Sequence, residues 1–227
     1  MRDERTSRRC GTHALDVPQP RSADAAPVLA GREMRLRPVK QSDYPFLLDL
    51  QVEPDNLVRW RYRGTTPSPE QIVQTLWQSV LAQFVIARVD DDEPIGLIVC
   101  YNPDFRHGYA YLAMIILPRY EMTGWIFEAV ALFLNYVFET FGFRKIYFEM
   151  LEFNYAKIAS GAGSLFHVEA CLRDHECHLG HRWHQYTLAT YRDEWPATLA
   201  RYYPHLVRCD DRVKPAHPRD YEPASTT

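Results

Sequence analysis

Apolar and polar positions first alternate at residues 34–39, Met-Arg-Leu-Arg-Pro-Val, as expected for a strand with one buried face. The next segment predicts a helix start. Ser42 or Asp43 can accept hydrogen bonds from the free N–H groups of the first turn, and Pro45 lies where its missing N–H costs nothing. Folded structure is therefore expected to begin with a strand followed at once by a helix.

A second helix is predicted from residues 68–71, Ser-Pro-Glu-Gln, because serine is a good cap and glutamine three residues later can bond back to it. We expect its apolar residues to point inward: Ile72, Leu76, Trp77, Val80 and Leu81.

Apolar runs separated by turn residues predict the remaining strands: 84–89, 95–101, 109–117, 144–151, 168–177 and 183–190. The run at 109–117 is apolar almost throughout, which favours a central strand. A long helix is predicted to end near Thr140, and a short helix is expected within 155–167 although Gly161 and Gly163 weaken it. This order of elements indicates an α/β fold with a mixed sheet.

Composition sets the domain limits. Residues 1–32 lack apolar periodicity and are expected to be a flexible tail, 33–195 to form one domain, and 196–227 to be a C-terminal extension. The net charge of -3 gives no electrostatic case for nucleic acid or an anionic membrane as partner, and no run is long enough to span a bilayer. Five scattered cysteines without a CxxC pair favour reduced thiols in the cytoplasm.

The segment 119–129, RYEMTGWIFEA, joins a strand to a helix through a turn with one glycine, Gly124. Backbone N–H groups at such a helix N-terminus can bind phosphate. A single glycine is also compatible with a plain strand-to-helix junction, so both interpretations stay open here.

Two polar clusters suggest other chemistry. Residues 175–184 hold four histidines and one cysteine, but they straddle a hairpin turn in which alternate side chains point to opposite faces, so no metal site is predicted. Residues 59–63, Arg-Trp-Arg-Tyr-Arg, are suited to an anionic acceptor or a carboxylate, and equally to a basic surface loop. The acidic turn 90–93 is interpreted as solvated.

An ordered set of short matches over roughly 34–195 resembles the GNAT superfamily of acyl-CoA-dependent N-acyltransferases, and within it the branch that acetylates ribosomal-protein N-termini and small amines. The matching residues are Ser42-Asp43, Pro94-Ile-Gly96, Pro118, Gly124, Glu128-Ala129, 138–142, Arg144-Lys-Ile146, Asn154, 169–173, Trp183 and Glu194-Trp195. The resemblance implies a mixed sheet, with helices on both faces, that is splayed between the fourth and fifth strands, where acyl-CoA inserts.

The resemblance also implies the residues of a CoA site, namely Ile116, Leu117, Arg119, Met122, Thr123, Gly124, Trp125, Ile126 and Asn154. Glu121 and Ile126 depart from the family's phosphate-loop pattern, because the first is acidic and the second is bulky. We expect the backbone amides to bind the pyrophosphate, with Arg119 supplying positive charge.

Relatives often carry a glutamate base on the fourth strand, and this chain has none there. We therefore assign the base to Glu149 on the fifth strand, acting through water, with Glu152 as a weaker candidate. The family's hydroxyl near the CoA sulfur is also displaced, so Ser160 and Tyr155 are the candidates. Arg61, Tyr62 and His175 are the expected acceptor-binding residues.

The sequence thus predicts an N-acyltransferase that moves an acyl group, in the first instance acetyl, from acyl-CoA to a primary amine by direct attack in a ternary complex. The acceptor is a small molecule or a peptide N-terminus, and a homodimer is left open. The alternatives are a module that binds acyl-CoA without turnover, a biosynthetic acyltransferase with another acyl group, and a metal-dependent protein built on the histidine hairpin.

Overall fold

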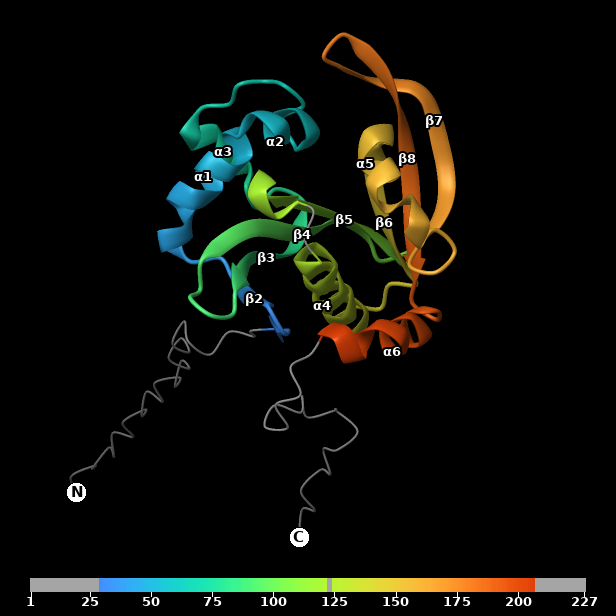
Figure 1. Ribbon diagram of the computed structural model, residues 1–227. Coiled ribbons are helices and arrows are strands. Elements are labelled where there is room, and N and C mark those ends of the chain that lie inside the picture. Colours follow the sequence, from blue (N-terminus) through green and yellow to red (C-terminus); the bar gives the residue numbers. More distant parts are fainter. Residues whose placement is uncertain (1–28, 122–123, 207–227) are drawn as a thin grey trace, which may run out of the picture.

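The computed structural model describes residues 29–121 and 124–206, and Figure 1 gives its arrangement. Within these ranges the strands are β1 Leu29–Ala30, β2 Met34–Pro38, β3 Val80–Arg88, β4 Pro94–Asp104, β5 Tyr109–Ile116, β6 Lys145–Leu151, β7 His167–His178 and β8 His181–Tyr191. The helices are α1 Tyr44–Val52, α2 Pro54–Arg59, α3 Pro69–Thr75, α4 Trp125–Thr140, α5 Glu152–Ile158 and α6 Trp195–Leu206, with short 3-10 turns at Gln41–Asp43, Pro118–Tyr120 and Ala159–Gly161.

The described strands form one eight-stranded sheet in the order β1-β2-β3-β4-β5-β6-β8-β7. β5 and β6 run parallel, whereas the other neighbouring strands in the described ranges are antiparallel. Helices cover both faces, with α1–α3 on one side and α4 on the other (Figure 1). The mixed sheet predicted from the sequence is confirmed.

Two apolar layers hold the helices to the sheet. On the α4 face, Phe133 is fully buried and its ring lies 5.8 Å from that of Phe84 on β3. On the opposite face, Leu47 and Leu50 of α1 pack with Leu97 and Ile115. Because alternate residues of β4 and β5 point to opposite faces, one strand pair supplies both layers, as expected for a central position.

The capping box predicted at Ser68 is present. The Ser68 hydroxyl accepts the Gln71 N–H at 3.3 Å, and the Gln71 side chain accepts the Ser68 N–H at 2.8 Å. The predicted length of this helix is wrong, since α3 ends at Thr75 and Val80 already begins β3. Trp77, expected to point inward, is 50% exposed.

The physical reason for this error lies in the residues after the helix. The β-branched and aromatic run that follows is better suited to a strand, and it pairs with β4 along its length. Ser79, with φ of 56°, turns the chain between the two elements. Tertiary pairing therefore overrides the helical spacing of Val80 and Leu81.

Three other boundaries differ from the expectation. The resemblance implies that Asn154 closes the fifth strand, but this residue lies inside α5, and the strand, β6, ends at Leu151. β1 pairs with β2 and includes residues assigned to the tail, and α6 begins at Trp195, the last residue of the predicted domain, and continues into the predicted C-terminal extension. Residues 1–28 lie outside the described residues, so the tail and the domain limits stay predictions.

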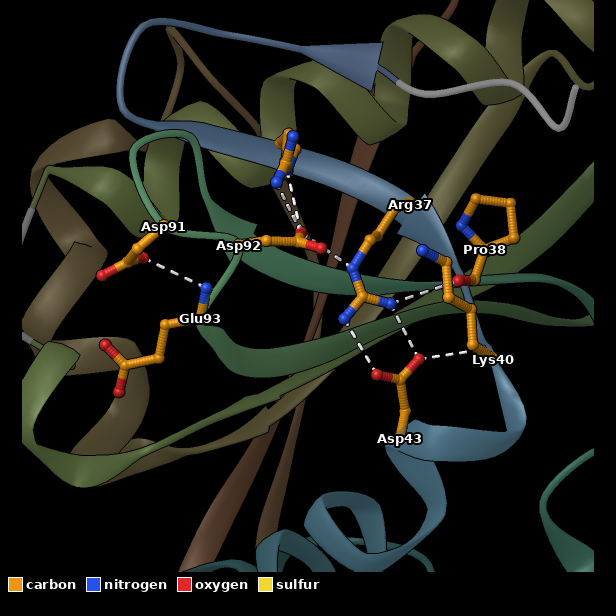
Figure 2. Close-up of polar contacts among 8 residues, drawn as sticks. Arg37, Pro38, Lys40, Asp43, Asp91, Asp92 and Glu93 are labelled. Carbon is orange, nitrogen blue, oxygen red and sulfur yellow. Dashed lines mark hydrogen bonds and ion pairs between the residues drawn. The ribbon is translucent and has the colours of Figure 1, made fainter. Parts of the chain in front are cut away.

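A buried ion pair joins the first strand of the domain to its first helix. Arg37 on β2 donates two hydrogen bonds to Asp43, at 2.7 and 2.8 Å, and a third to Asp92 in the β3–β4 turn at 3.0 Å (Figure 2). The side chains of Arg37 and Asp43 are 8% and 6% exposed. Asp43 is predicted as a helix cap. Its carboxylate instead accepts the hydrogen bonds from Arg37 and one from the Lys40 N–H at 2.7 Å.

One buried side chain on the α1–α3 face lacks polar partners. Both polar atoms of Gln83 on β3 are buried and have no hydrogen-bond partner among the described residues. Gln51 of α1 is equally buried, but it donates to the Leu47 carbonyl at 3.2 Å and accepts from the Trp60 indole at 3.2 Å. The two glutamines therefore form a natural comparison.

Replacing Asp43 with Asn should lower the free energy of unfolding by about 3 kcal/mol, because it removes the charged group that accepts two hydrogen bonds from the buried Arg37 guanidinium and leaves only Asp92, at 3.0 Å, as its charge partner among the described residues. Burial raises the pKa of Asp43, but the bonds from Arg37 and Lys40 outweigh burial and hold it below its ordinary value. The wild-type protein should therefore keep this stabilisation above about pH 4 and lose it as the pH falls through the folded-state pKa. Urea unfolding of both proteins between pH 7 and pH 3 measures this, and a difference that persists unchanged at pH 3 would contradict it.

Replacing Gln83 with Met should raise the free energy of unfolding by about 1 kcal/mol, since it removes an unsatisfied buried amide at similar volume. The matched change, Gln51→Met, should lower it, because it breaks two satisfied hydrogen bonds. Urea unfolding of the two variants is the measurement. A loss of stability of the same size in both would show that the Gln83 amide is satisfied in solution.

Candidate functional site

The sheet opens between β5 and β6. The two strands pair at only three positions, Tyr109 with Lys145, Ala110 with Ile146 and Tyr111 with Tyr147. Beyond these, β5 continues along β4 as far as Ile116, and β6 continues along β8 as far as Leu151. The facing edges 112–116 and 148–151 therefore have no strand partner among the described residues. Free N–H and C=O groups on such edges can bond an extended amide-containing ligand.

The turn that leads from β5 into α4 lies at the mouth of this opening. Its residue Gly124 precedes α4 with φ of -61°, an ordinary helical value, and a Cβ placed there would meet nothing within 4 Å. Neither backbone conformation nor packing within the described chain therefore requires glycine. The first amides of α4 lack acceptors within the helix, as at any helix N-terminus, so a close approach to the backbone by an anion is compatible with this residue.

Glu121 and Ile126, which depart from the family's phosphate-loop pattern, both have partners in the described structure. Glu121 forms an ion pair with Lys157 of α5 at 3.1 Å, which neutralises its charge and spans the mouth between the strand ends. The side chain of Ile126 packs against the apolar core on the α4 face and so leaves the turn. Met122 and Thr123 lie outside the described residues.

Arginines lie beside this turn, although their charges are already engaged. Arg119 donates to Glu93 at 2.6 Å and stacks over the ring of Tyr120. Arg88, which the sequence interpretation did not single out, lies 6.0 Å from the centre of the Trp125 ring. Arg119 is thus directed to the β3–β4 turn, and Arg88 brings a second guanidinium next to the first residue of α4.

On the α1–α3 face, a row of phenol rings crosses the sheet where it begins to part. Tyr101, Tyr111 and Tyr147 are direct neighbours on β4, β5 and β6, with ring centres 5.6 and 5.3 Å apart. Burial raises the pKa of Tyr101 to about 12, and the charge of Glu149 adds to that rise. Burial also raises the pKa of Tyr111, so the phenols of Tyr101 and Tyr111 are neutral hydrogen-bond donors near pH 7.

Glu149, the predicted base, lies two residues after Tyr147 and so on the same face. Its side chain is exposed, and it influences the pKa of both Tyr101 and Tyr111. The sequence interpretation missed Tyr101 as a site residue because it belongs to a strand interior. The available signal was the pairing of one tyrosine on each of three successive strands.

Of the predicted acceptor residues, Arg61 lies close enough to the tyrosine row to affect Tyr101, whereas His175 lies on the β7–β8 hairpin. Arg61 donates to the Thr75 carbonyl at 2.5 Å, and the Tyr62 hydroxyl lies 2.8 Å from the Thr75 hydroxyl. Arg63, which follows them, forms an ion pair with Glu176 of β7, so the α2–α3 connection meets the β7–β8 hairpin above the sheet (Figure 1). His175 is exposed on that hairpin.

The two candidate hydroxyls differ in how they are held. The ring of Tyr155 stacks on that of Tyr186 at 4.1 Å and an angle of 14°, which fixes its position against β8. Ser160 is exposed in the 3-10 turn after α5. Asn154 is half-buried in α5, close to the edge where β6 ends.

The histidine hairpin does not gather metal ligands. His184 accepts the Asp174 N–H at 3.0 Å, and the ring of His178 lies 5.8 Å from that of Phe153. Over residues 29–121 and 124–206, no group of three or more His, Cys, Asp or Glu side chains is placed to hold a metal ion. The described helices are also too short or too polar to cross a membrane.

Solved structures of the same fold come from several bacteria. A probable acetyltransferase of the GNAT family from Chromobacterium violaceum aligns with a TM-score of 0.60 and 22% identity, over 84% of this chain and 100% of that one. A GCN5-related N-acetyltransferase from Brucella melitensis gives 0.61 and 21%, over 84% and 90%. Spermidine N-acetyltransferase from Vibrio cholerae, solved in complex with CoA and spermine, gives 0.63 and 18%, over 72% and 98%. At these identities the likeness establishes the fold.

No curated protein matches the sequence closely enough to count as a relative. The family described as acetyltransferase (GNAT) domain, however, matches residues 33–160, which is more than half of the 227 residues. The match covers the strands that part, the turn into α4 and the helix α5 beyond the opening. The finer likeness to the branch that acts on ribosomal-protein N-termini stays a prediction. The chain belongs to the GNAT family of acetyltransferases.

Proposed function

We propose that this enzyme transfers an acyl group, in the first instance acetyl, from acyl-CoA to a primary amine within a ternary complex. The observation that carries the proposal is the parting of β5 from β6 after three paired residues, directly beside the N-terminus of α4. The opening supplies free backbone groups for the pantetheine chain, and the helix supplies amides for the pyrophosphate. The acceptor then approaches from the tyrosine row on the other face.

The reaction balances without a protein nucleophile. The neutral amine attacks the thioester carbonyl carbon, a C–N bond forms and the C–S bond breaks. One proton leaves the nitrogen and one proton ends on the thiolate, so the products are an amide and free CoA. The chain must therefore provide a base for the amine, a donor for the oxyanion and a proton for the sulfur.

We assign the CoA contacts to the strand end and the helix start. In this proposal, Ile116 and Leu117 offer backbone groups, the turn around Gly124, Trp125 and Ile126 binds the pyrophosphate, and Asn154 bonds the pantetheine. Because Arg119 is held by Glu93, we assign it a supporting electrostatic role beside Arg88.

We assign the base to Glu149, because it is exposed on the tyrosine face two residues beyond the last β5–β6 pair. The proton for the thiolate is assigned to Tyr155, whose ring is fixed by its stack on Tyr186, ahead of Ser160. These roles extend the sequence prediction and are supported by where each side chain lies in the fold.

Acetyl-CoA as donor, a small amine as acceptor and a cytoplasmic location complete the proposal. The Vibrio cholerae structure pairs CoA with a polyamine, which supports amine acylation in this fold. The competing proposal, a binding module without turnover, predicts stabilisation by acetyl-CoA but no release of free thiol with any amine.

Replacing Gly124 with Ala should weaken CoA binding while sparing the fold. The added methyl meets no protein atom, so the free energy of unfolding without ligand should change by less than about 1 kcal/mol. If pyrophosphate binds against this turn, the same methyl crowds it, and the binding free energy becomes less favourable by about 1–3 kcal/mol. The dissociation constant for CoA should then rise roughly fivefold or more.

Calorimetric titration with CoA, together with the melting temperature of each free protein, measures this effect. Gly142→Ala, at another position where a Cβ meets nothing, is the matched control and should leave CoA affinity unchanged. Equal affinity for CoA in the wild type and the Gly124→Ala variant would show that the pyrophosphate does not bind at this turn.

Replacing Glu149 with Gln should lower kcat about 100-fold with little effect on CoA affinity, because a positioned general base contributes on this scale. Glu149→Asp should recover part of the rate, especially at higher pH where more of the amine is already neutral. Thiol release under saturating acetyl-CoA measures the rates. Glu139→Gln, an exposed carboxylate at the far end of α4, is the charge-matched control. An unchanged kcat in the Glu149→Gln variant would exclude it as the base.

A further inference from the structure

The acceptor face carries opposite charges at the two sides of its tyrosine row. Tyr101, Tyr111 and Tyr147 form a continuous aromatic floor across three strands, with ring centres 5.6 and 5.3 Å apart. Glu149 lies next to the β6 side of this floor, and Arg61 approaches the β4 side from the α2–α3 connection. Burial is the main cause of the raised pKa of Tyr101, and both charges also act on it: Glu149 raises this pKa further, whereas Arg63 and Arg61 lower it.

Arg61 is a partly buried guanidinium without a carboxylate partner. It donates one bond, to the Thr75 carbonyl at 2.5 Å, and it lies 5.8 Å from the centre of the Trp60 ring. No acid whose side chain the structure describes forms an ion pair with it. Burial lowers the pKa of Arg61, but an arginine remains charged near pH 7. A desolvated cation of this kind gains strongly from a carboxylate.

The neighbouring arginine gives an internal contrast. Arg63 is exposed, and its charge is met by Glu176 of the β7–β8 hairpin. That ion pair joins the α2–α3 connection to the β7–β8 hairpin. Of the two arginines that act on Tyr101, Arg61 is therefore the one whose charge is not already met by a carboxylate of the described residues.

Glu149 is an unpaired anion, among the described side chains, at the β6 side of the tyrosine floor. It is exposed, and no ion pair or hydrogen bond to it is formed by the described side chains. A carboxylate beside aromatic rings attracts an ammonium group, which must arrive here before it loses a proton and reacts. The floor thus offers an anionic end at the strand opening and a cationic end away from it.

We propose that the acceptor is an amino-carboxylate, with its amine at Glu149, its carboxylate bonded to Arg61 and its carbon chain on the tyrosine floor. The inference rests on the proposed function and names the acceptor class of that site. It places Arg61 as the residue that selects the acceptor. A polyamine, which carries positive charge at both ends, would meet the guanidinium unfavourably.

The experiment compares acceptors that differ only in the carboxylate. Suitable pairs are phenylalanine with phenethylamine and 6-aminohexanoate with hexylamine, because they cover short and long separations between the two groups; two steps between strands correspond to about 10 Å. Spermine is the dicationic comparison. The wild-type protein should acetylate at least one amino-carboxylate with kcat/KM about ten- to a hundredfold above its decarboxylated partner.

Arg61→Gln should remove this preference through a higher KM for the amino-carboxylate, while the KM for the simple amine stays within about twofold. Arg61→Lys should retain part of it, since a point charge replaces the planar fork. Arg106→Gln, the same charge loss in the exposed β4–β5 turn, is the matched control and should keep the preference. The melting-temperature shift with acetyl-CoA should be the same in all four proteins, which checks that the fold and the CoA site are intact.

Equal or better turnover of the simple amines or of spermine by the wild type would overturn the inference and leave acyl transfer standing. An equal loss for both members of a pair in Arg61→Gln, through kcat, would also overturn it, because that is the result of a structural role. If acetyl-CoA neither stabilises the protein nor is consumed, the proposed function fails, and the inference fails with it. If the Arg61→Gln variant is unstable, calorimetry of the paired acceptors binding to the wild-type CoA complex tests the inference instead. The amino-carboxylate is expected to bind more tightly than the simple amine.

Discussion

The arrangement of the site depends on the loss of hydrogen bonding between two parallel strands. β5 and β6 share three pairs, after which each strand remains attached only to its outer neighbour. Such edges are unfavourable in a closed core because their N–H and C=O groups must find partners. An extended amide ligand satisfies them without changing the sheet. The turn into α4 and the tyrosine row lie next to the opening, where we propose that CoA and the acceptor bind.

Electrostatic pairing explains how an atypical phosphate turn is compatible with this arrangement. Glu121 is compensated by Lys157 across the mouth, and Arg119 by Glu93, so the turn carries little net charge of its own. Binding of an anion there must depend on backbone amides and the helix dipole more than on side-chain charge. The acceptor face differs, because Arg61 and Glu149 are not compensated by each other or by described neighbours.

Much of the fold could be predicted from the sequence, because local signals and tertiary packing agree there. The box at Ser68, the apolar strand predicted at 109–117 and the final hairpin of β7 and β8 are present as expected. The exceptions are places where long-range pairing decides. Val80 fits a helical spacing but pairs with Tyr101 on β4, and Asn154 follows a strand that had already ended.

The site was less predictable for a related reason. Gly124 is visible in the sequence because it directly precedes a helix, and Glu149 is visible because it is the one acidic residue of a predicted strand. Tyr101 and the pairing of Arg63 with Glu176 depend on strand register and on contacts between segments more than 100 residues apart, which local patterns do not encode. Backbone hydrogen exchange with and without acetyl-CoA tests the central claim most directly. Slower exchange of amides within 112–116 and 148–151 on binding is predicted, and unchanged exchange at both edges with protection elsewhere would contradict it.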